Sequence, residues 1–236
     1  MFFNPMYFAF ILPGVLLAGW AQWKVMSAYR LASQIPSLQG FTGAQAAEHM
    51  LRSAGVEGLL IEPIGGELSD HYDPAGKVLR LSEGVYGSHS LAAVGIAAHE
   101  AGHALQDAQH YPLLVLRGAL VPMASLGSNL SWVVIMVGML MLAAVPVLGK
   151  TVLLAGIALF SLTVLFQLVN LPVEFDASRR ARLALVEHGI VSPDEDLEVK
   201  KVLDAAALTY LAGTLTGILT LFYYLWSSGF LGGRDE

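Results

Sequence analysis

The chain has 236 residues, of which 55% are hydrophobic and 14% are charged, and its formal net charge is −6 at pH 7. An ordinary soluble domain has roughly a quarter of its residues charged, so this composition is hard to reconcile with a wholly soluble protein. So few charged side chains are sufficient only if lipid covers part of the surface. The negative net charge argues against nucleic acid as a partner, because no basic excess is present to neutralise phosphates. The sequence has no cysteine, which excludes disulfides, cysteine metal ligands and a cysteine nucleophile.

The charged residues are missing from long continuous stretches. No Asp, Glu, Lys, Arg or His occurs in Met1–Trp23, Gly118–Gly149, Thr151–Val173 or Ala205–Gly233. A helix needs about 20 apolar residues to cross the hydrocarbon core of a bilayer, so we predict membrane-spanning helices over residues 5–23, 122–147, 151–171 and 206–229. A helix buried in a large soluble core explains one such stretch but not all of them. The first stretch lacks the basic start and the cleavage site of a signal peptide, and we interpret it as an uncleaved anchor.

Lys and Arg are distributed unevenly between the two sides of the predicted membrane. The segments 24–117 and 174–204 are separated by an even number of spans and therefore lie on the same side. Together they carry every Lys and Arg except Lys150 and Arg234. The positive-inside rule then predicts a multi-pass cell-membrane protein with both segments in the cytoplasm and both termini outside.

The polar segments predict a small α+β domain interleaved with the spans of a mainly α protein. In segment 24–117 we expect, in order, a helix over Gly43–Ser53 capped by Thr42, strands over Leu59–Ile64 and Lys77–Ser82 with a turn at Asp73–Gly76 between them, and a helix from Ser88 or Ser90 to about Gln109. Segment 174–204 is predicted to be helical again, with an acidic start at Asp194–Asp196 before the last span. The predicted organisation is thus a first span in 1–23, an α+β segment in 24–117, a hairpin of two spans in 118–173, a helical segment in 174–204 and a last span with a short tail in 205–236.

A possible metal site lies in the second predicted helix of segment 24–117, which contains His99, Glu100 and His103 in the pattern HExxH. Histidines at positions i and i+4 project from the same face of a helix, so both imidazoles can bind one ion. Glu100 lies about 100° round the helix, where it can take a proton from a water molecule at the metal. The alternative is a helix that carries two surface histidines and a glutamate without a metal. The residues around the motif are small and apolar, however, so the helix is expected to be packed against other elements. Partly buried histidines and a glutamate need a partner, and a cation can supply one. We therefore interpret the motif as a zinc site of the kind found in zinc peptidases.

A catalytic zinc ion takes three protein ligands and leaves a fourth position open for water. Without cysteine, the third ligand must be His, Asp or Glu from elsewhere on the same side of the membrane. Glu174 is the best candidate, at what we expect to be the start of the helix that emerges from the third span, where an acid is also favoured by the helix N-terminus. Asp176 is the rival ligand, although it points to another face and can pair with Arg179 or Arg180 instead.

The sequence resembles a known family over these motifs. The run HEAGHALQ at 99–106, the run LPVEFDASRRA at 171–181 and the four-span layout look like the YugP-like neutral membrane zinc metallopeptidases. His71–Pro74, Lys77–Ser82, Tyr111–Pro112 and Leu208–Tyr210 also fit, so the likeness covers nearly the whole chain. More distantly the chain is similar to the HtpX-type and CAAX-protease-type membrane peptidases, which belong to the gluzincins.

The resemblance implies Zn²⁺ bound by His99, His103 and Glu174, with Glu100 as the general base of a zinc metalloendopeptidase. One position departs from the wider superfamily, where an Asp four residues after the ligand Glu often supports a zinc histidine. Here that position is Ser178. A hydroxyl accepts a histidine N–H less strongly than a carboxylate does, so further support for the ligands is expected from elsewhere.

The expected partners are a protein or peptide substrate and the lipid bilayer, and a homo-oligomer or a membrane partner is left open. We predict that an extended substrate pairs with the strand Lys77–Ser82 by β-augmentation, although that strand can equally be an ordinary member of a sheet. His110, Tyr86, Tyr210 and Asn129 are candidates for the group that stabilises the oxyanion.

Two other classes of protein remain to be weighed against a peptidase. A zinc-stabilised membrane scaffold or chaperone that does not cleave is the main alternative. A transporter is disfavoured, because it predicts charged residues within the spans and none occur.

Overall fold

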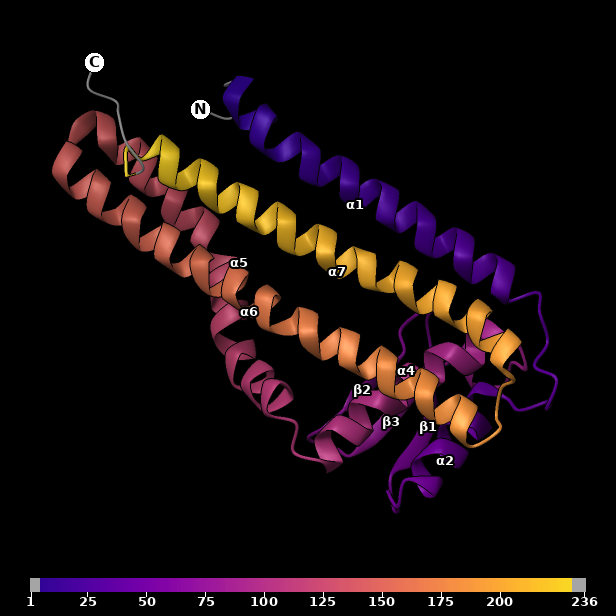
Figure 1. The fold of residues 1–236 in the computed structure, drawn as a ribbon. Coiled ribbons are helices and arrows are strands. Elements are labelled where there is room, and N and C mark those ends of the chain that lie inside the picture. Colours follow the sequence, from indigo (N-terminus) through magenta and orange to yellow (C-terminus); the bar gives the residue numbers. More distant parts are fainter. Residues whose placement is uncertain (1–4, 231–236) are drawn as a thin grey trace. The chain divides into compact units, whose positions relative to one another are not determined.

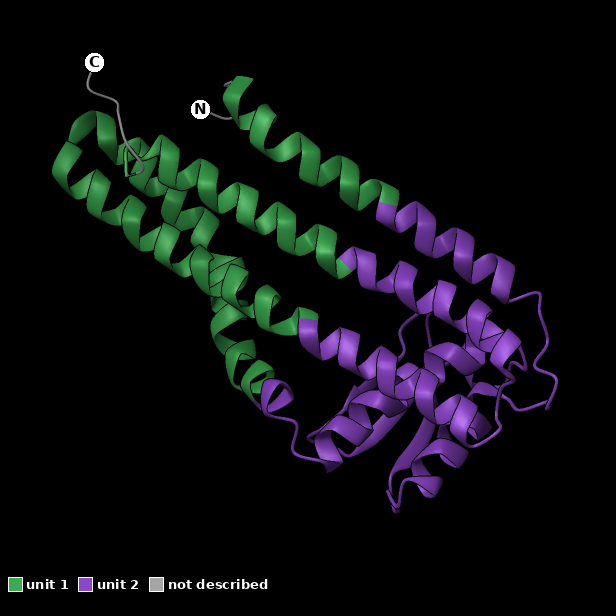
Figure 2. Ribbon diagram, in the orientation of Figure 1, with its two compact units in different colours: residues 1–20, 116–171, 210–236 green, residues 21–115, 172–209 purple. Residues whose placement is uncertain are grey.

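The structure is a computed structural model that describes residues 5–230, and it is predominantly helical (Figure 1). In chain order its elements are α1 (Pro5–Ala32), α2 (Gly43–Ser53), β1 (Leu60–Ile64), β2 (His71–Asp73), β3 (Val78–Ser82), α3 (Glu83–Tyr86), α4 (Leu91–Ala108), α5 (Pro112–Ala144), α6 (Pro146–Glu187) and α7 (Pro193–Ser227). They divide into two compact units, coloured in Figure 2. Unit 1 comprises residues 1–20, 116–171 and 210–236, and unit 2 comprises residues 21–115 and 172–209.

Unit 1 consists of the apolar parts of four long helices. Among the described residues, the helices α1, α5, α6 and α7 are each long and apolar enough to cross a membrane, and they contain the four stretches predicted as spans except for the ends of the second and the fourth. They are longer than predicted, because α1 continues to Ala32, α5 already begins at Pro112 and α6 runs on to Glu187. Within unit 1, α5 and α6 pack closely at Gly138, where an added Cβ atom would lie 2.4 Å from the backbone nitrogen of Leu153.

Unit 2 has a continuous hydrophobic core formed by α2, α4, the sheet and the parts of α6 and α7 that belong to this unit. Among its fully buried large side chains are Met50, Leu79, Leu81, Leu91, Leu185 and Ile190. The many alanines of α4 allow close packing, since the buried residues of this helix include Ala93, Ala97, Ala98 and Ala101. The helix is therefore held on several sides by other elements of the same unit.

The predicted helix starts of unit 2 are confirmed. Thr42 caps α2 in a capping box, in which its hydroxyl accepts from the Gln45 backbone N–H and the Gln45 side chain accepts from the Thr42 N–H. At α4 the cap is Ser90, whose hydroxyl accepts from the Ala93 N–H at 3.2 Å. These local signals fix where α2 and α4 begin, and for α4 they fix the register of the HExxH motif.

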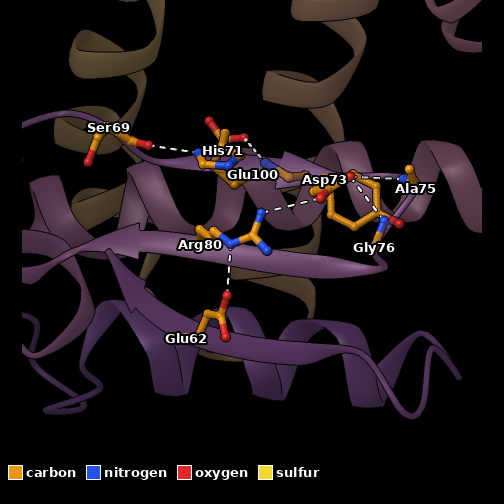
Figure 3. A network of polar contacts seen from close by, with 9 residues as sticks. Glu62, Ser69, His71, Asp73, Ala75, Gly76, Arg80 and Glu100 are labelled. Atoms are coloured by element: carbon orange, nitrogen blue, oxygen red, sulfur yellow. Dashed lines mark hydrogen bonds and ion pairs between the residues drawn. The ribbon is translucent and has the colours of Figure 1, made fainter. Parts of the chain in front are cut away.

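The sheet of unit 2 corrects the predicted strand arrangement. It has three strands in the order β1-β3-β2, with β1 parallel and β2 antiparallel to β3. The strand β2 was not predicted, and the turn that follows Asp73 joins β2 to β3 rather than β1 to β3. Asp73 makes this turn by accepting the backbone N–H groups of Ala75 and Gly76. Across the sheet Arg80 donates to Glu62 on one side and to Asp73 on the other (Figure 3).

The helix α6 corrects two further expectations. The break before it lies at Val145, inside the predicted second span of 122–147, because Pro146 starts a new helix. The predicted third span and the segment that follows it form one continuous helix with Pro172 in its interior. Glu174 is therefore not at a helix N-terminus, and the favourable helix-end charge that the sequence predicted for it is absent.

Candidate metal centre

The helix α4 presents the two histidines of the motif on one face. His99 and His103 are one turn apart, their ring centroids lie 4.9 Å from each other, and the rings are inclined by 80°. His103 is buried, with 6% of its surface exposed, and His99 is partly buried. This arrangement follows from the i, i+4 spacing together with the tight packing of α4 inside unit 2.

The helix α6 approaches α4 closely enough to add a third donor. At Gly102 the two helices are almost in backbone contact, since an added Cβ atom would lie 2.5 Å from the carbonyl oxygen of Ala177. Glu174 is 2% exposed. Its Oε2 atom lies 3.3 Å from Nε2 of His99 and 3.5 Å from Nε2 of His103. Two segments that are far apart in the sequence thus place three donor atoms within 4.8 Å of one another.

These three donors fit a zinc ion. Zinc binds histidine nitrogen and carboxylate oxygen at about 2.0–2.2 Å in tetrahedral geometry, which places neighbouring donor atoms about 3.3 Å apart. The two measured separations between Glu174 and the histidines agree with that edge length. Two neutral imidazoles and one carboxylate also form a common ligand set of catalytic zinc, which keeps a fourth position open.

The rival ligand Asp176 does not belong to the cluster. Its Oδ1 atom accepts from Arg179 at 2.6 Å, and its Oδ2 atom pairs with Arg180 and accepts from the Gln106 amide at 3.0 Å. Its negative charge is thus compensated by two guanidinium groups. The structure brings Glu174, and not Asp176, to the two histidines.

Each histidine is also held through its second ring nitrogen. Nδ1 of His99 lies 3.1 Å from Oγ of Ser178, the residue that replaces the expected aspartate. Nδ1 of His103 lies 3.0 Å from Oε1 of Gln106. Such contacts orient metal-binding imidazoles. Gln106 was not predicted to belong to the site, although its position three residues after His103 on the same face of α4 indicates that the two side chains can be in contact.

Glu100 lies beside the cluster and is held by the sheet. Its Oε2 atom accepts the backbone N–H of Tyr72 in β2 at 3.1 Å, and Figure 3 shows the carboxylate next to this strand. Burial raises the pKa of Glu100 to about 7, and the negative charges of Glu174 and Asp70 act in the same direction. The electrostatic interaction with His99 and the Tyr72 hydrogen bond oppose this shift. A carboxylate with a pKa near neutrality can both accept and return a proton.

Comparison with known proteins now adds independent information. A family model described as "Putative neutral zinc metallopeptidase" matches residues 7–229. The chain belongs to this family. It is also 42% identical over 232 residues to "Putative membrane protease YugP" of Bacillus subtilis (strain 168), an alignment that covers 98% of this chain and 100% of the relative. No solved structure matches the chain.

The comparisons agree with two features of the structure. Membership of a zinc metallopeptidase family is consistent with a His–His–Glu cluster that could bind a metal. The relative's name as a membrane protease agrees with four helices that are able to span a bilayer. The chain is accordingly a multi-pass membrane member of the neutral zinc metallopeptidase family.

In this family member, β2 is tied to α4 by a polar cluster beyond the HExxH motif. The Tyr72 hydroxyl donates to Oδ2 of Asp107 at 2.6 Å, and the Lys77 ammonium group also donates to Oδ2. Burial and the Asp107 hydrogen bond raise the pKa of Tyr72 above its ordinary value. The helix α4 therefore contacts β2 twice: Glu100 accepts the backbone N–H of Tyr72, and Asp107 accepts the Tyr72 hydroxyl.

The four residues expected to stabilise an oxyanion stay predictions. Tyr86 lies in α3 and packs against the hydrophobic core of unit 2. His110 follows the end of α4 with a backbone φ of 51°. Asn129 and Tyr210 lie in unit 1.

Proposed function

We propose that the protein is a zinc-dependent endopeptidase in which His99, His103 and Glu174 bind the metal and Glu100 is the general base. The observation that carries this proposal is the convergence of the three donor atoms within 4.8 Å, with Glu100 adjacent to His99 on α4. Zinc, when bound, polarises the peptide carbonyl and increases the acidity of water. Family membership and the name of the relative support the reaction class.

The Glu100 carboxylate moves the proton in this proposal. It takes a proton from the attacking water and returns it to the nitrogen of the leaving amine, so that the peptide bond breaks and no net proton is consumed within the site. Its pKa of about 7 suits both steps. The Tyr72 backbone N–H fixes one carboxylate oxygen and thereby the direction in which Glu100 faces.

The sequence left open whether Lys77–Ser82 pairs with a substrate or is an ordinary member of a sheet, and the sheet supports the second alternative. The strand β3 lies in the centre of the sheet and is paired with β1 on one side and with β2 on the other. The strand next to Glu100 is β2, which among the described residues pairs only with β3. We therefore propose that an extended substrate backbone lies along the outer edge of β2 without using the Tyr72 N–H, which Glu100 already accepts.

Membrane proteins or membrane-proximal proteins are the proposed substrates, and the proposed location of the metal centre is the cytoplasmic side. The support for this sidedness is the distribution of Lys and Arg in the sequence. The relative is itself named a membrane protease.

A cleavage assay on the purified full-length protein tests the reaction. Wild type is expected to cleave casein or a quenched peptide mixture, to lose this activity with a zinc chelator and to regain it with added zinc. Glu100→Gln is expected to retain zinc and lose activity by about 10²–10⁴-fold, whereas Glu57→Gln, at an exposed glutamate outside the site, is expected to match wild type. If wild type and Glu100→Gln show identical background cleavage while both bind zinc, the peptidase proposal fails and a zinc-stabilised scaffold takes its place.

A further inference from the structure

One side chain in unit 2 touches both helices that supply the metal donors. Gln106 lies on α4 one turn after His103, and none of its surface is exposed. Its Oε1 atom lies 3.0 Å from Nδ1 of His103. Its Nε2 atom donates to the carbonyl oxygen of Val173 at 2.9 Å and to Oδ2 of Asp176 at 3.0 Å, and both of these residues are neighbours of Glu174 on α6.

The partners of Nε2 fix the orientation of the amide. A backbone carbonyl can only accept a hydrogen bond, and Asp176 is a carboxylate paired with Arg179 and Arg180, so it too accepts. The NH₂ group must therefore face α6, and the amide oxygen must face His103. A flipped amide would place its oxygen against two acceptors, at the cost of both bonds in a fully buried position.

The fixed amide in turn determines which ring nitrogen of His103 is available to a metal. The Oε1 atom of Gln106 has no proton to donate, so Nδ1 of His103 carries a proton, and in the neutral imidazole that binds a metal the lone pair is on Nε2. That Nε2 atom is the one 3.5 Å from Glu174. His99 has no equivalent constraint, because the Ser178 hydroxyl at its Nδ1 can either donate or accept.

We propose that Gln106 is a positioning residue that sets the tautomer of His103 and, through Val173 and Asp176, the placement of Glu174, so that its amide group determines the zinc affinity of the site. This inference rests on the proposed function, because the amide acts through the zinc ligands. It also supplies further support for the zinc ligands, at His103 rather than at His99, where Ser178 stands in place of the expected aspartate.

Two substitutions separate the parts of this role. Gln106→Met keeps nearly the same volume and removes all three hydrogen bonds. Gln106→Glu keeps an acceptor for His103 but turns a second oxygen toward Val173 and Asp176. Gln45→Met is the matched control: it breaks the capping box of α2, which lowers stability, but it touches no donor of the cluster.

Zinc affinity of the full-length protein in detergent is the deciding measurement, obtained by titrating metal-free protein with zinc against a chromophoric chelator, alongside its melting temperature. Gln106→Met and Gln106→Glu are each expected to weaken zinc binding about 10–100-fold, while Gln45→Met lowers the melting temperature and leaves zinc affinity within about twofold of wild type.

Three results would overturn the inference. Zinc binding by Gln106→Met within twofold of wild type, or weakened no more than by Gln45→Met, rules out a positioning role. Zinc binding by Gln106→Glu as tight as wild type rules out the connection to α6, because an acceptor at Nδ1 alone would then suffice. A wild-type protein that binds no zinc contradicts the proposed function itself, and this outcome is distinguishable from the other two.

Discussion

Gly102 is the residue at which α4 and α6 come closest. A Cβ atom there would lie 2.5 Å from the carbonyl oxygen of Ala177 and 3.1 Å from its carbonyl carbon, and both are backbone atoms that cannot rotate away. Ala177 is next to Ser178, which contacts His99. We predict that Gly102→Ala lowers the free energy of unfolding by about 1–3 kcal/mol, as overpacking does, and also weakens zinc binding.

The control for this substitution is Gly118→Ala in α5. Gly118 has no atom within 4 Å of an added Cβ, so alanine there should be neutral or stabilising by up to about 1 kcal/mol through helix propensity. Thermal unfolding and zinc titration of both variants check the prediction. Equal behaviour of the two variants would show that the close approach of the helices at Gly102 is not required.

Asp107 provides a prediction about pH. Burial disfavours its charged form, but hydrogen bonds from Lys77 and Tyr72 outweigh burial, so the pKa of Asp107 is lower than that of an ordinary aspartate. A carboxyl group with a lowered folded-state pKa stabilises the fold above its unfolded pKa of about 3.9, and this stability is lost as the pH falls through the folded value. We expect wild type to be about 1 kcal/mol more stable than Asp107→Asn at neutral pH, a modest value because Lys77 is exposed.

The difference in stability between these two proteins should shrink progressively as the pH is lowered below about 4. Thermal unfolding of both proteins over that range of pH measures it. A difference that stays constant down to the acid end would contradict the assignment of an ionised Asp107 to the hydrogen bonds with Tyr72 and Lys77.

Part of the site could be predicted from single residues and part could not. Spacing alone brings His99, Glu100 and His103 together, because a helix repeats every few residues. Glu174 required a choice among acids. Its alternative explanation, an acid at a helix N-terminus, does not apply because α6 is continuous there, and the structure places Glu174 at the histidines. The contact of Gln106 with His103 could be predicted from their spacing on one helix, but its link to α6 could not, because its partners Val173 and Asp176 are 67 and 70 residues away in the sequence.

At the scale of elements, β2 is the least supported part of the sheet. It has only three residues, and within residues 5–230 it pairs with β3 alone. We predict that Tyr72→Phe, which removes the hydroxyl that donates to Asp107 but keeps the backbone N–H that donates to Glu100, loosens this strand. The loss of one hydrogen bond of about 1 kcal/mol corresponds to about fivefold faster amide exchange in residues 71–73.

Hydrogen exchange measured peptide by peptide tests this prediction, with β1 as the internal reference. Exchange in residues 60–64 should be the same in wild type and Tyr72→Phe. Uniformly faster exchange in both strands would mean that the hydroxyl stabilises unit 2 as a whole and not β2 in particular.

The elements that the sequence predicted are those with local signals. Thr42 and Ser90 mark helix starts through their hydroxyls, and the structure confirms both caps. The strand β2 was missed because three residues are too few to show an alternating pattern. The parallel pairing of β1 with β3 was missed because the chain passes through the unpredicted strand β2 between them and so enters β3 in the same direction as β1. The continuity of α6 was missed because a proline such as Pro172 usually ends or kinks a helix, whereas α6 continues through it.

At the scale of the whole molecule, the sidedness of the membrane segments is the main untested expectation. The chain has no cysteine, so a single introduced cysteine is a unique label. We predict that Lys150→Cys reacts with a membrane-impermeant maleimide on intact cells, while Lys201→Cys reacts only after the cells are opened. Both lysines are exposed. The reverse pattern would place segments 24–117 and 174–204 outside the cell.

The four spans could be predicted because the absence of charge over about 20 residues is a local property of the sequence. The way in which separate segments join into units is not local. Unit 2 combines residues 21–115 with residues 172–209, and the metal centre contains donors from both pieces. Family membership supports the chemistry that this combination suggests.

Metal analysis of the purified full-length protein tests the central claim most directly. Wild type and Glu100→Gln are each expected to contain one zinc ion per chain, because Glu100 is not a ligand in this account. Glu57→Gln, outside the site, should keep its zinc, and Glu174→Gln should lose it, because Glu174 provides the third donor. A wild-type protein without stoichiometric zinc, or a Glu174→Gln variant that retains it in full, would contradict the proposed metal centre.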